Sequence, residues 1–234
     1  MEAHMAVSKI GKYATSISGD TLELIERPNG GLSIVLADGQ WSGKSAKAIS
    51  NVVTRKAVSL LADGVRDGAA ARAASDYLYT YRSGKVQATL NILSIDLQSQ
   101  TLVITRNNPA PVILVHKGEI IYLNQAASPV GTRIGIRPEI NEIPLEQGLV
   151  VIAFTDGLLD AGERTGQKLD IARCINQLIL EGIPEPTHWA DSLLEQAIAL
   201  DQGRPVDDIS IVVIAILPRT GDNSRRLTAC MPLN

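Results

Sequence analysis

The chain has 234 residues, with 22 basic and 25 acidic side chains and a formal net charge of −3. This length suits one sizeable domain, and 45% hydrophobic residues with only 3% aromatic residues predict an aliphatic core. The charge and the lack of a long basic run argue against a nucleic-acid partner, and the longest apolar run, residues 209–217, is about half of what a membrane span needs.

The two ends of the chain are expected to lie outside the domain. Residues 1–5 look like a vector scar before a native start at Met5, and residues 219–234 form a polar tail. The expected domain therefore spans residues 6–218, with no signal peptide before it. Cys174 and Cys230 are the only cysteines, and two isolated cysteines favour a reducing, cytoplasmic compartment over a disulfide scaffold.

The first half of the chain predicts a hairpin, two helices and a run of strands. Residues 17–26 and 31–37 flank the turn signal Pro28-Asn29-Gly30-Gly31. Apolar side chains at helical spacing predict one helix over 45–62 and another around 70–81. The short connections that follow require antiparallel pairing, and they join expected strands near residues 87–95, 101–106, 111–115 and 119–123.

The second half begins with a loop-rich segment, residues 124–147, in which prolines and glycines recur. A strand at 149–154, helices at 168–181 and 187–201, and a last strand at 209–217 complete the expected order. Strands, two helices, strands, two helices and one strand predict an α+β fold, in which antiparallel sheet carries helices grouped on its outer faces.

Three aspartates lie where apolar strands end or begin. Asp38 follows the run 33–37, Asp156 follows the run 150–155, and Asp207, with Asp208 beside it, precedes the run 209–217. Carboxylates at strand ends can converge on one sheet edge, where they repel unless a hard cation such as Mg²⁺ or Mn²⁺ holds them. Because single Asp-Gly pairs are common in turns, the predicted metal site rests on the three strand ends together.

Other kinds of site fit the sequence less well. Residues 39–45 are similar to a phosphate-binding P-loop, but Asp38 stands where that motif needs its first glycine and would repel a phosphate. Scattered histidines and unpaired cysteines disfavour zinc, and no Gly-x-Ser-x-Gly elbow supports a serine nucleophile. Trp41 is either a loop residue that covers a pocket or an ordinary core aromatic.

An ordered set of short motifs resembles one protein family. The chain resembles the bacterial branch of the metal-dependent serine/threonine protein phosphatases that contains the sporulation phosphatase SpoIIE, and within it the RsbX-type phosphatases of the stressosome. Each motif is weak alone, but the ordered set spans almost the whole chain. The matching segments are Ser18-Gly19-Asp20, Val35-Leu36-Ala37-Asp38-Gly39 through Ser42-Gly43, Ala88-Thr89, Asn107-Asn108-Pro109-Ala110-Pro111, Phe154-Thr155-Asp156-Gly157 and Asp207-Asp208-Ile209-Ser210.

The resemblance implies a four-layer αββα sandwich, two mostly antiparallel sheets flanked by helix pairs, with two Mn²⁺ or Mg²⁺ ions at one end. By motif position, Asp38 would bridge both ions, and the carbonyl of Gly39 would bind one of them. Asp156 and Asp207 would bind the other ion, and Asp20 would act through metal-bound water. Asp208 falls beside a ligand position.

The chain departs from the family pattern at two positions. The family has Asp-Gly-x-Gly-x-Gly, and Trp41 replaces the middle glycine, so this loop takes a different shape or tolerates bulk. Gln40 stands where eukaryotic members have a histidine that is proposed to protonate the leaving group. An amide cannot do so near neutral pH.

The function implied by the resemblance is that of a cytoplasmic phosphoserine/phosphothreonine protein phosphatase. In it, Asp38, Asp156 and Asp207 hold two metals, and a metal-bridged hydroxide attacks the phosphate in line. The implied partner is a phosphorylated signalling protein, a stressosome scaffold or an anti-sigma antagonist component, with no nucleic acid and no membrane. The alternative is a catalytically weak phosphoprotein-binding module of the same fold, and a P-loop-like NTPase is a more distant one.

Overall fold

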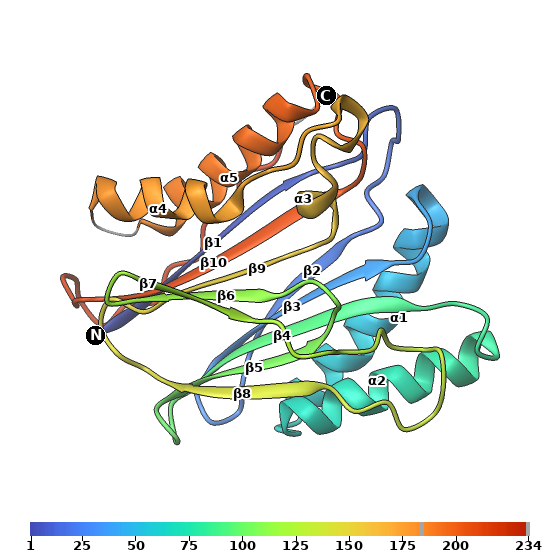
Figure 1. The fold of residues 1–234 in the computed structure, drawn as a ribbon. Coiled ribbons are helices and arrows are strands. Elements are labelled where there is room, and N and C mark those ends of the chain that lie inside the picture. The colour runs from blue at the N-terminus through green and yellow to red at the C-terminus, as the bar shows by residue number, and fades with distance from the viewer. Residues whose placement is uncertain (183–184, 233–234) are drawn as a thin grey trace.

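The computed structural model describes residues 1–182 and 185–232. Two five-stranded sheets are stacked face to face, and helices cover the outer face of each (Figure 1). The pairings between the named strands are all antiparallel. The expected four-layer sandwich is thus confirmed, and it differs from the parallel α/β sheet that carries a P-loop.

The first sheet has the strand order β1-β10-β9-β6-β7. Helices α4 (Ile171–Glu181) and α5 (Pro186–Leu200) cover its outer face, and the short helix α3 (Gly157–Asp160) and a 3-10 turn (Glu163–Thr165) follow β9. The strands of this sheet are β1 (Glu2–Ile10), β6 (Val112–His116), β7 (Glu119–Leu123), β9 (Val150–Phe154) and β10 (Ile209–Leu217).

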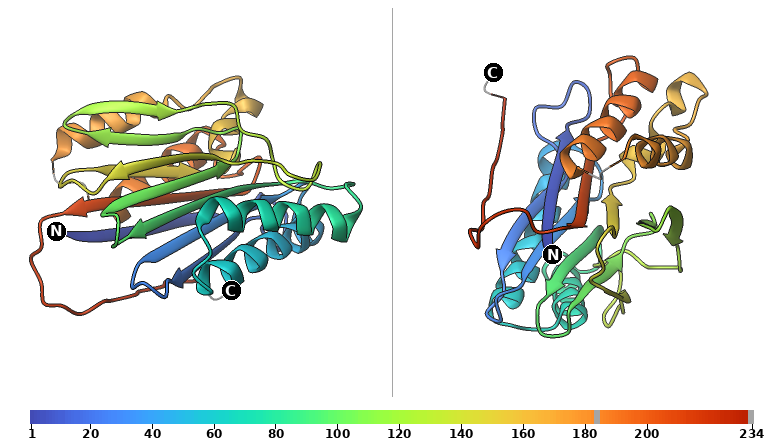
Figure 2. Two further views of the ribbon diagram at one scale, coloured as in Figure 1. Left: turned by 90° about the horizontal axis from the view of Figure 1, so that it is seen from below. Right: turned by 90° about the vertical axis from the view of Figure 1, so that its left-hand side faces the viewer.

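The second sheet has the strand order β2-β3-β4-β5-β8. Helices α1 (Gly43–Ala62) and α2 (Asp67–Arg82) pack on its outer face, which Figure 2 shows from below. The strands of this sheet are β2 (Thr21–Glu26), β3 (Leu32–Gly39), β4 (Ala88–Asp96), β5 (Thr101–Asn107) and β8 (Glu139–Pro144).

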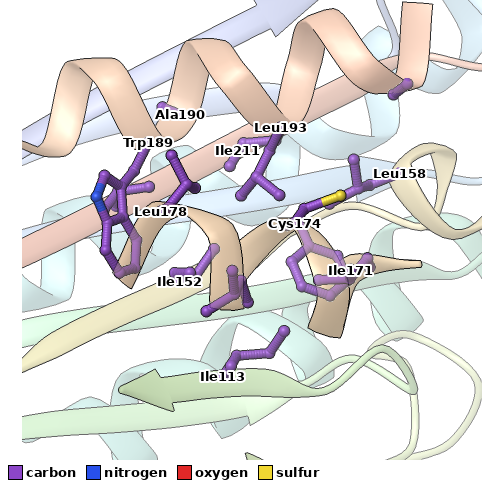
Figure 3. Close-up of a cluster of buried hydrophobic side chains, with 14 of the residues drawn as sticks. Ile113, Ile152, Leu158, Ile171, Cys174, Leu178, Trp189, Ala190, Leu193 and Ile211 are labelled. Carbon is purple, nitrogen blue, oxygen red and sulfur yellow. The ribbon is translucent and has the colours of Figure 1, made fainter. Parts of the chain in front are cut away.

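Three apolar interfaces hold the four layers together. Along β10, Ile211 and Val213 face the helices α4 and α5, whereas Val212 and Ile214 face the second sheet. A central strand that is buried on both faces consists of consecutive apolar residues. For this reason β10 can be predicted from the sequence. Figure 3 shows the interface under α4 and α5, where Trp189 and Cys174 are buried side chains of the core.

Two strands were not predicted from the sequence, and both lie at sheet edges. β8 lies within the segment that was expected to be loop. β1 begins at Glu2 and pairs with β10 along its whole length, from Glu2 opposite Leu217 to Ile10 opposite Ile209. Residues 2–5, expected to lie outside the domain, are therefore part of the first sheet.

The ends of the other elements shift by a few residues. The first expected strand starts at Thr21 rather than residue 17, because residues 11–20 form a loop. The described part of the tail, residues 218–232, has no helix or strand, and Arg225 reaches the carbonyl of Gly30 at 2.8 Å. None of the described helices is long and apolar enough to cross a membrane.

Candidate active site at one end of the sandwich

Four aspartates from the ends of four strands converge at one end of the sandwich. Asp20 precedes β2 and Asp38 lies near the end of β3, both in the second sheet. Asp156 follows β9 and Asp207 precedes β10, two adjacent antiparallel strands of the first sheet. The negative charges of Asp20, Asp156 and Asp207 all raise the pKa of Asp38. The structure thus brings together the acidic residues that the sequence selected.

The environment of these carboxyl groups disfavours negative charge. Burial, followed by the charges of Asp20 and Asp156, raises the pKa of Asp38 to about 9. Burial likewise raises the pKa of Asp20 to about 6, although a hydrogen bond from Ser210 opposes the shift. The pKa of Asp156 is raised by burial and by the charge of Asp207. Such a cluster is held ionised most readily by a bound cation.

Asp20 is fully buried, and two hydroxyl groups hold one of its oxygens. Ser210 Oγ donates to Asp20 Oδ2 at 2.6 Å, and Thr155 Oγ1 donates to the same oxygen at 3.1 Å. The second oxygen, Oδ1, is also buried and accepts from no N–H or hydroxyl group of the described residues, and the carboxyl group of Asp38 lies within hydrogen-bonding reach of that of Asp20. Because an unpaired buried carboxylate oxygen is costly, a ligand such as a hard cation or its bound water fits this position.

The donor set fits Mg²⁺ or Mn²⁺, since it consists of carboxylate and carbonyl oxygens. Asp156 as a whole residue is exposed, although the protein atoms around its carboxyl group still raise its pKa, and Asp38 and Asp207 are half-buried. Within residues 1–182 and 185–232, no three His, Cys, Asp or Glu side chains are grouped closely enough to form a finished metal site. The fit to an ion therefore rests on donor chemistry, charge and the unpaired oxygen of Asp20.

Asp208 anchors the loop that leads to Asp20. Its Oδ1 accepts from the backbone N–H of Lys12 at 2.8 Å, and its Oδ2 accepts from that of Gly19 at 2.7 Å. Both oxygens are thus engaged by the 11–20 loop, and the residue is buried. Asp208 therefore positions the loop that carries Asp20. Asp207 is engaged only at Oδ1, which accepts from the backbone N–H of Asp208 at 2.9 Å, and its Oδ2 has no hydrogen-bond partner among the described residues.

Three lysines, which the sequence analysis did not select, surround the acidic cluster. Lys9 Nζ from β1 and Lys47 Nζ from α1 both donate to the backbone carbonyl of Asp20, each at 2.7 Å. Lys12 Nζ lies 3.9 Å from Asp207 Oδ1. Burial lowers the pKa of Lys9, and the carboxylates of Asp20, Asp208 and Asp38 oppose that shift. The lysines carry no spacing signal, because only the folded chain brings them to the aspartates.

Two glycines allow the elements around the site to approach closely. A Cβ on Gly39 would lie 2.0 Å from the carbonyl oxygen of Ala46 in α1, and one on Gly157 would lie 2.2 Å from that of Asp208. Both positions therefore exclude any side chain. Close packing therefore requires glycine after Asp38 and after Asp156, in addition to any role of these Asp-Gly pairs in turns.

Trp41 lies in a backbone conformation that favours glycine. Trp41 has a φ of +78°, in the left-handed region, and its side chain is 63% exposed. The core-aromatic interpretation of Trp41 is therefore wrong, and the residue lies on an exposed loop three positions after Asp38. The neighbouring Gln40 accepts a hydrogen bond from the backbone N–H of Gln87 through Oε1 at 3.2 Å. That contact ties the Gln40 amide to the start of β4.

The Asn107–Pro111 motif fastens the β5–β6 connection beside the site. Asn108 Nδ2 donates to the carbonyl of Phe154 at 3.3 Å, two residues before Asp156. Its Oδ1 accepts from the N–H of Ala110 at 2.9 Å. The buried guanidinium of Arg106 donates to the carbonyl of Asn108. These contacts make the motif a structural support for the end of β9.

Comparison with known proteins agrees with this architecture. The chain is 20% identical over 215 residues to Stage II sporulation protein E of Priestia megaterium, a match that covers 92% of this chain and 36% of that protein. This chain thus spans about a third of the length of that relative. Among solved structures, the PP2C phosphatase domain of SpoIIE from Bacillus subtilis, with a fragment of its regulatory domain, superposes with a TM-score of 0.79 at 21% identity. That match covers 94% of this chain and 64% of the other.

Two further structures share the fold and were determined with metal ions. The catalytic domain of the serine/threonine protein phosphatase PstP, in complex with two manganese ions, gives a TM-score of 0.71 at 17% identity and covers 92% of this chain and 99% of its own. RsbX in complex with magnesium gives a TM-score of 0.68 at 17% identity, with coverages of 91% and 94%.

The family assignment rests on the sequence match itself. The family model described as Stage II sporulation protein E (SpoIIE) matches residues 28–217, a range that includes Asp38, Asp156 and Asp207. The solved phosphatase domains described above share the fold of this chain. The chain belongs to the SpoIIE family.

Proposed function

We propose that this chain is a metal-dependent phosphoserine/phosphothreonine protein phosphatase. The observation that carries the proposal is the convergence of Asp20, Asp38, Asp156 and Asp207 from four strand ends, with one buried oxygen of Asp20 unpaired. A cluster of oxygen ligands at a strand edge suits two hard cations. The phosphatases of similar fold that were determined with manganese or magnesium support this proposal.

The residues fit the two ions in the following way. Asp38, Asp156, Asp207 and the carbonyl of Gly39 would hold the two ions. Asp20 takes part through water at its unpaired oxygen. When bound, two Mn²⁺ or Mg²⁺ ions supply a hydroxide-like nucleophile at neutral pH and stabilise the charge that develops on the phosphate.

The other residues of the site position the ligands and supply positive charge. Ser210 and Thr155 orient Asp20. Lys9, Lys12 and Lys47 place cationic groups beside the aspartates, where they favour the approach of a phosphate dianion. The amide of Gln40 accepts from the N–H of Gln87 and cannot titrate, so the proton for the leaving group would come from water, or turnover would be slow.

We infer further that the substrate is a phosphorylated signalling protein in a partner-switching pathway of the stressosome type. The similarity of fold to RsbX supports this assignment. We place the protein in the cytoplasm, which agrees with its two free cysteines, Cys174 and Cys230.

The alternative function is that of a catalytically weak module that binds phosphoproteins. The observation in its favour is Trp41, a bulky residue held in a glycine-like conformation near Asp38. A module of this kind would bind a phosphopeptide without releasing phosphate repeatedly. Counting the phosphates released per chain therefore distinguishes the two functions.

The test uses matched phosphoserine, phosphothreonine and phosphotyrosine peptides with Mn²⁺ or Mg²⁺. We expect many turnovers per chain on the first two peptides and little on phosphotyrosine. Binding of phosphoserine peptide without turnover in either metal would favour the binding module. Preferential turnover of phosphotyrosine would contradict the assigned substrate class.

A further inference from the structure

A groove of about 690 Å³ opens on the outer side of the second sheet, between the first half of α2 and β8. Arg66 and Arg72 line it from the α2 side, Arg137 lines it from the segment before β8, and Arg27 contributes from the end of the β2 region. Four arginines against Asp67, Asp96 and Glu142 leave the lining with one net positive charge, and the proposed phosphatase chemistry does not use this groove.

Three of these arginines remain available to a ligand. Arg27 is engaged within the protein, since it pairs with Asp67 Oδ1 at 2.8 Å and donates to the carbonyl of Val65 at 2.9 Å. Arg66, Arg72 and Arg137 are exposed, and in the described part of the chain their guanidinium groups form no hydrogen bond or ion pair. Arginine guanidinium groups are suited to bidentate recognition of carboxylates and phosphates.

The charge around the groove favours an acidic partner. Residues 43–85, which form α1, α2 and their connections, carry eight lysines and arginines and three aspartates, a net charge of +5. The remainder of the chain carries −8, and residues 157–200, which include α3, α4 and α5, carry −4. The two helical layers therefore differ in sign, and the α1–α2 layer attracts acidic molecules to the side on which the groove lies.

The lining favours a peptide segment over a small polyphosphate. Asp96 and Glu142 line the groove together with the apolar Val103, Pro138 and Ile140, and the side chain of Ile140 is 48% exposed. A segment of alternating acidic and apolar residues can pair with the arginines while its apolar side chains cover Ile140. A compact polyphosphate would bring its charge close to the two carboxylates.

We propose that this α2–β8 groove binds an acidic segment of a partner protein. Asp96 follows Ile95, which pairs with Leu32 at the start of β3, whereas Asp38 is six residues further along β3. At about 3.3 Å per residue, the Asp96 end of the groove lies roughly 20 Å from the aspartate cluster. Binding there leaves the catalytic end of the sandwich open.

The test is a fluorescence-polarisation titration of a fluorescein-labelled peptide rich in aspartate, glutamate and leucine, with the full chain kept in chelator. The groove variant combines Arg66→Gln, Arg72→Gln and Arg137→Gln. The matched control combines Arg55→Gln, Arg82→Gln and Lys85→Gln, which remove the same charge from the same layer outside the groove. We expect saturable binding that weakens with salt, a loss of about tenfold or more in the groove variant, and a much smaller loss in the control.

Two results would overturn the proposal. Equal losses in both variants would assign the binding to diffuse charge, and unchanged binding in the groove variant would exclude these arginines. Sodium tripolyphosphate serves as the second probe; saturable binding of tripolyphosphate without binding of the peptide would assign the groove to a small polyanion and contradict the peptide proposal.

Because the three groove arginines are exposed, the groove variant should melt as the wild-type chain does. Arg137→Gln alone, outside any helix or strand, serves as a second variant with a weaker effect in the same direction. Metal-dependent hydrolysis of a small phosphate ester should be unchanged in all of these variants. Binding is measured in chelator, so failure of the groove proposal and failure of the phosphatase proposal are distinguishable.

Discussion

Ser210 donates a hydrogen bond of 2.6 Å to Asp20, a residue 190 positions earlier in the chain. Ser210 belongs to β10 in the first sheet, and Asp20 immediately precedes β2 in the second sheet. The bond therefore joins the two sheets at the end where the aspartates converge. Thr155 reinforces it, since its hydroxyl also donates to Asp20 and accepts from the N–H of Ser210 at 3.0 Å.

Removing this hydroxyl should disturb both the fold and the site. Ser210→Ala leaves Asp20 with one donor fewer in a buried position, and we expect a loss of about 1–3 kcal/mol in the free energy of unfolding. The concentration of Mn²⁺ needed for half-maximal activity should rise, because Asp20 is no longer held in one orientation. Thermal melting and a metal titration check the two effects. Ser45→Ala, at an exposed position of α1, is the control and should change neither the melting temperature nor the Mn²⁺ requirement. If Ser210→Ala also left both quantities unchanged, the role assigned to this hydrogen bond would be contradicted.

Asp156→Asn and Asp207→Asn each keep the shape of the side chain and remove its charge. Each substitution should lower the rate of phosphate release by orders of magnitude, because a divalent cation loses an anionic ligand. Neither should lower the melting temperature in chelator, since the remaining carboxylates then repel one another less. Near-normal turnover in both variants would show that these residues do not hold the metals.

Asp38→Asn should raise the melting temperature in chelator near neutral pH. The folded chain raises the pKa of Asp38 to about 9 from an ordinary value of 3.8, so folding costs free energy wherever the unfolded chain carries the charged form. Asparagine avoids this cost, and we expect a gain of about 1 kcal/mol or more in unfolding free energy. The gain should disappear as the pH falls toward 4, where the unfolded carboxyl is protonated too. An unchanged melting temperature at neutral pH would contradict the crowding of carboxylates at this position.

Trp41→Gly should relieve backbone strain and remove bulk near Asp38. A non-glycine residue at a φ of +78° is costly, so we expect stability to rise by up to about 1 kcal/mol. Hydrolysis of a small phosphate ester should increase with easier access, and hydrolysis of a phosphoprotein should decrease if the indole contacts the substrate. Trp41→Ala is the control, since it removes the indole and keeps the strain. Lower stability in the glycine variant would contradict the strained-loop account.

The sequence predicts the buried part of the fold because the central strands are apolar on both faces. The strands β3, β9 and β10 read as continuous runs for this reason, and their ends locate Asp38, Asp156 and Asp207. The edge strands β2 and β7 are as exposed as β1 and β8, but short turns to β3 and β6 made them predictable. β1 begins in residues taken for a vector scar, and β8 lies in a segment rich in proline and glycine, so neither showed such a turn. A half-exposed strand shows no apolar run.

The supporting residues of the site could not be predicted in the same way. Lys9 and Lys47 meet at the carbonyl of Asp20 from a strand and a helix that are distant in sequence. Ser210 and Thr155 lie inside segments that the family resemblance singled out, but nothing in their spacing shows that both hydroxyls reach Asp20. Long-range contacts of this kind depend on how the two sheets stack.

The central claim is that phosphate release depends on divalent metal ions held by the aspartate cluster. The most direct measurement is the rate of phosphate release from a phosphoserine peptide by metal-stripped protein as Mn²⁺ is added and then removed by excess chelator. We predict no release without metal, a saturable rise with Mn²⁺ and complete loss in chelator. A full rate in excess chelator would contradict the claim.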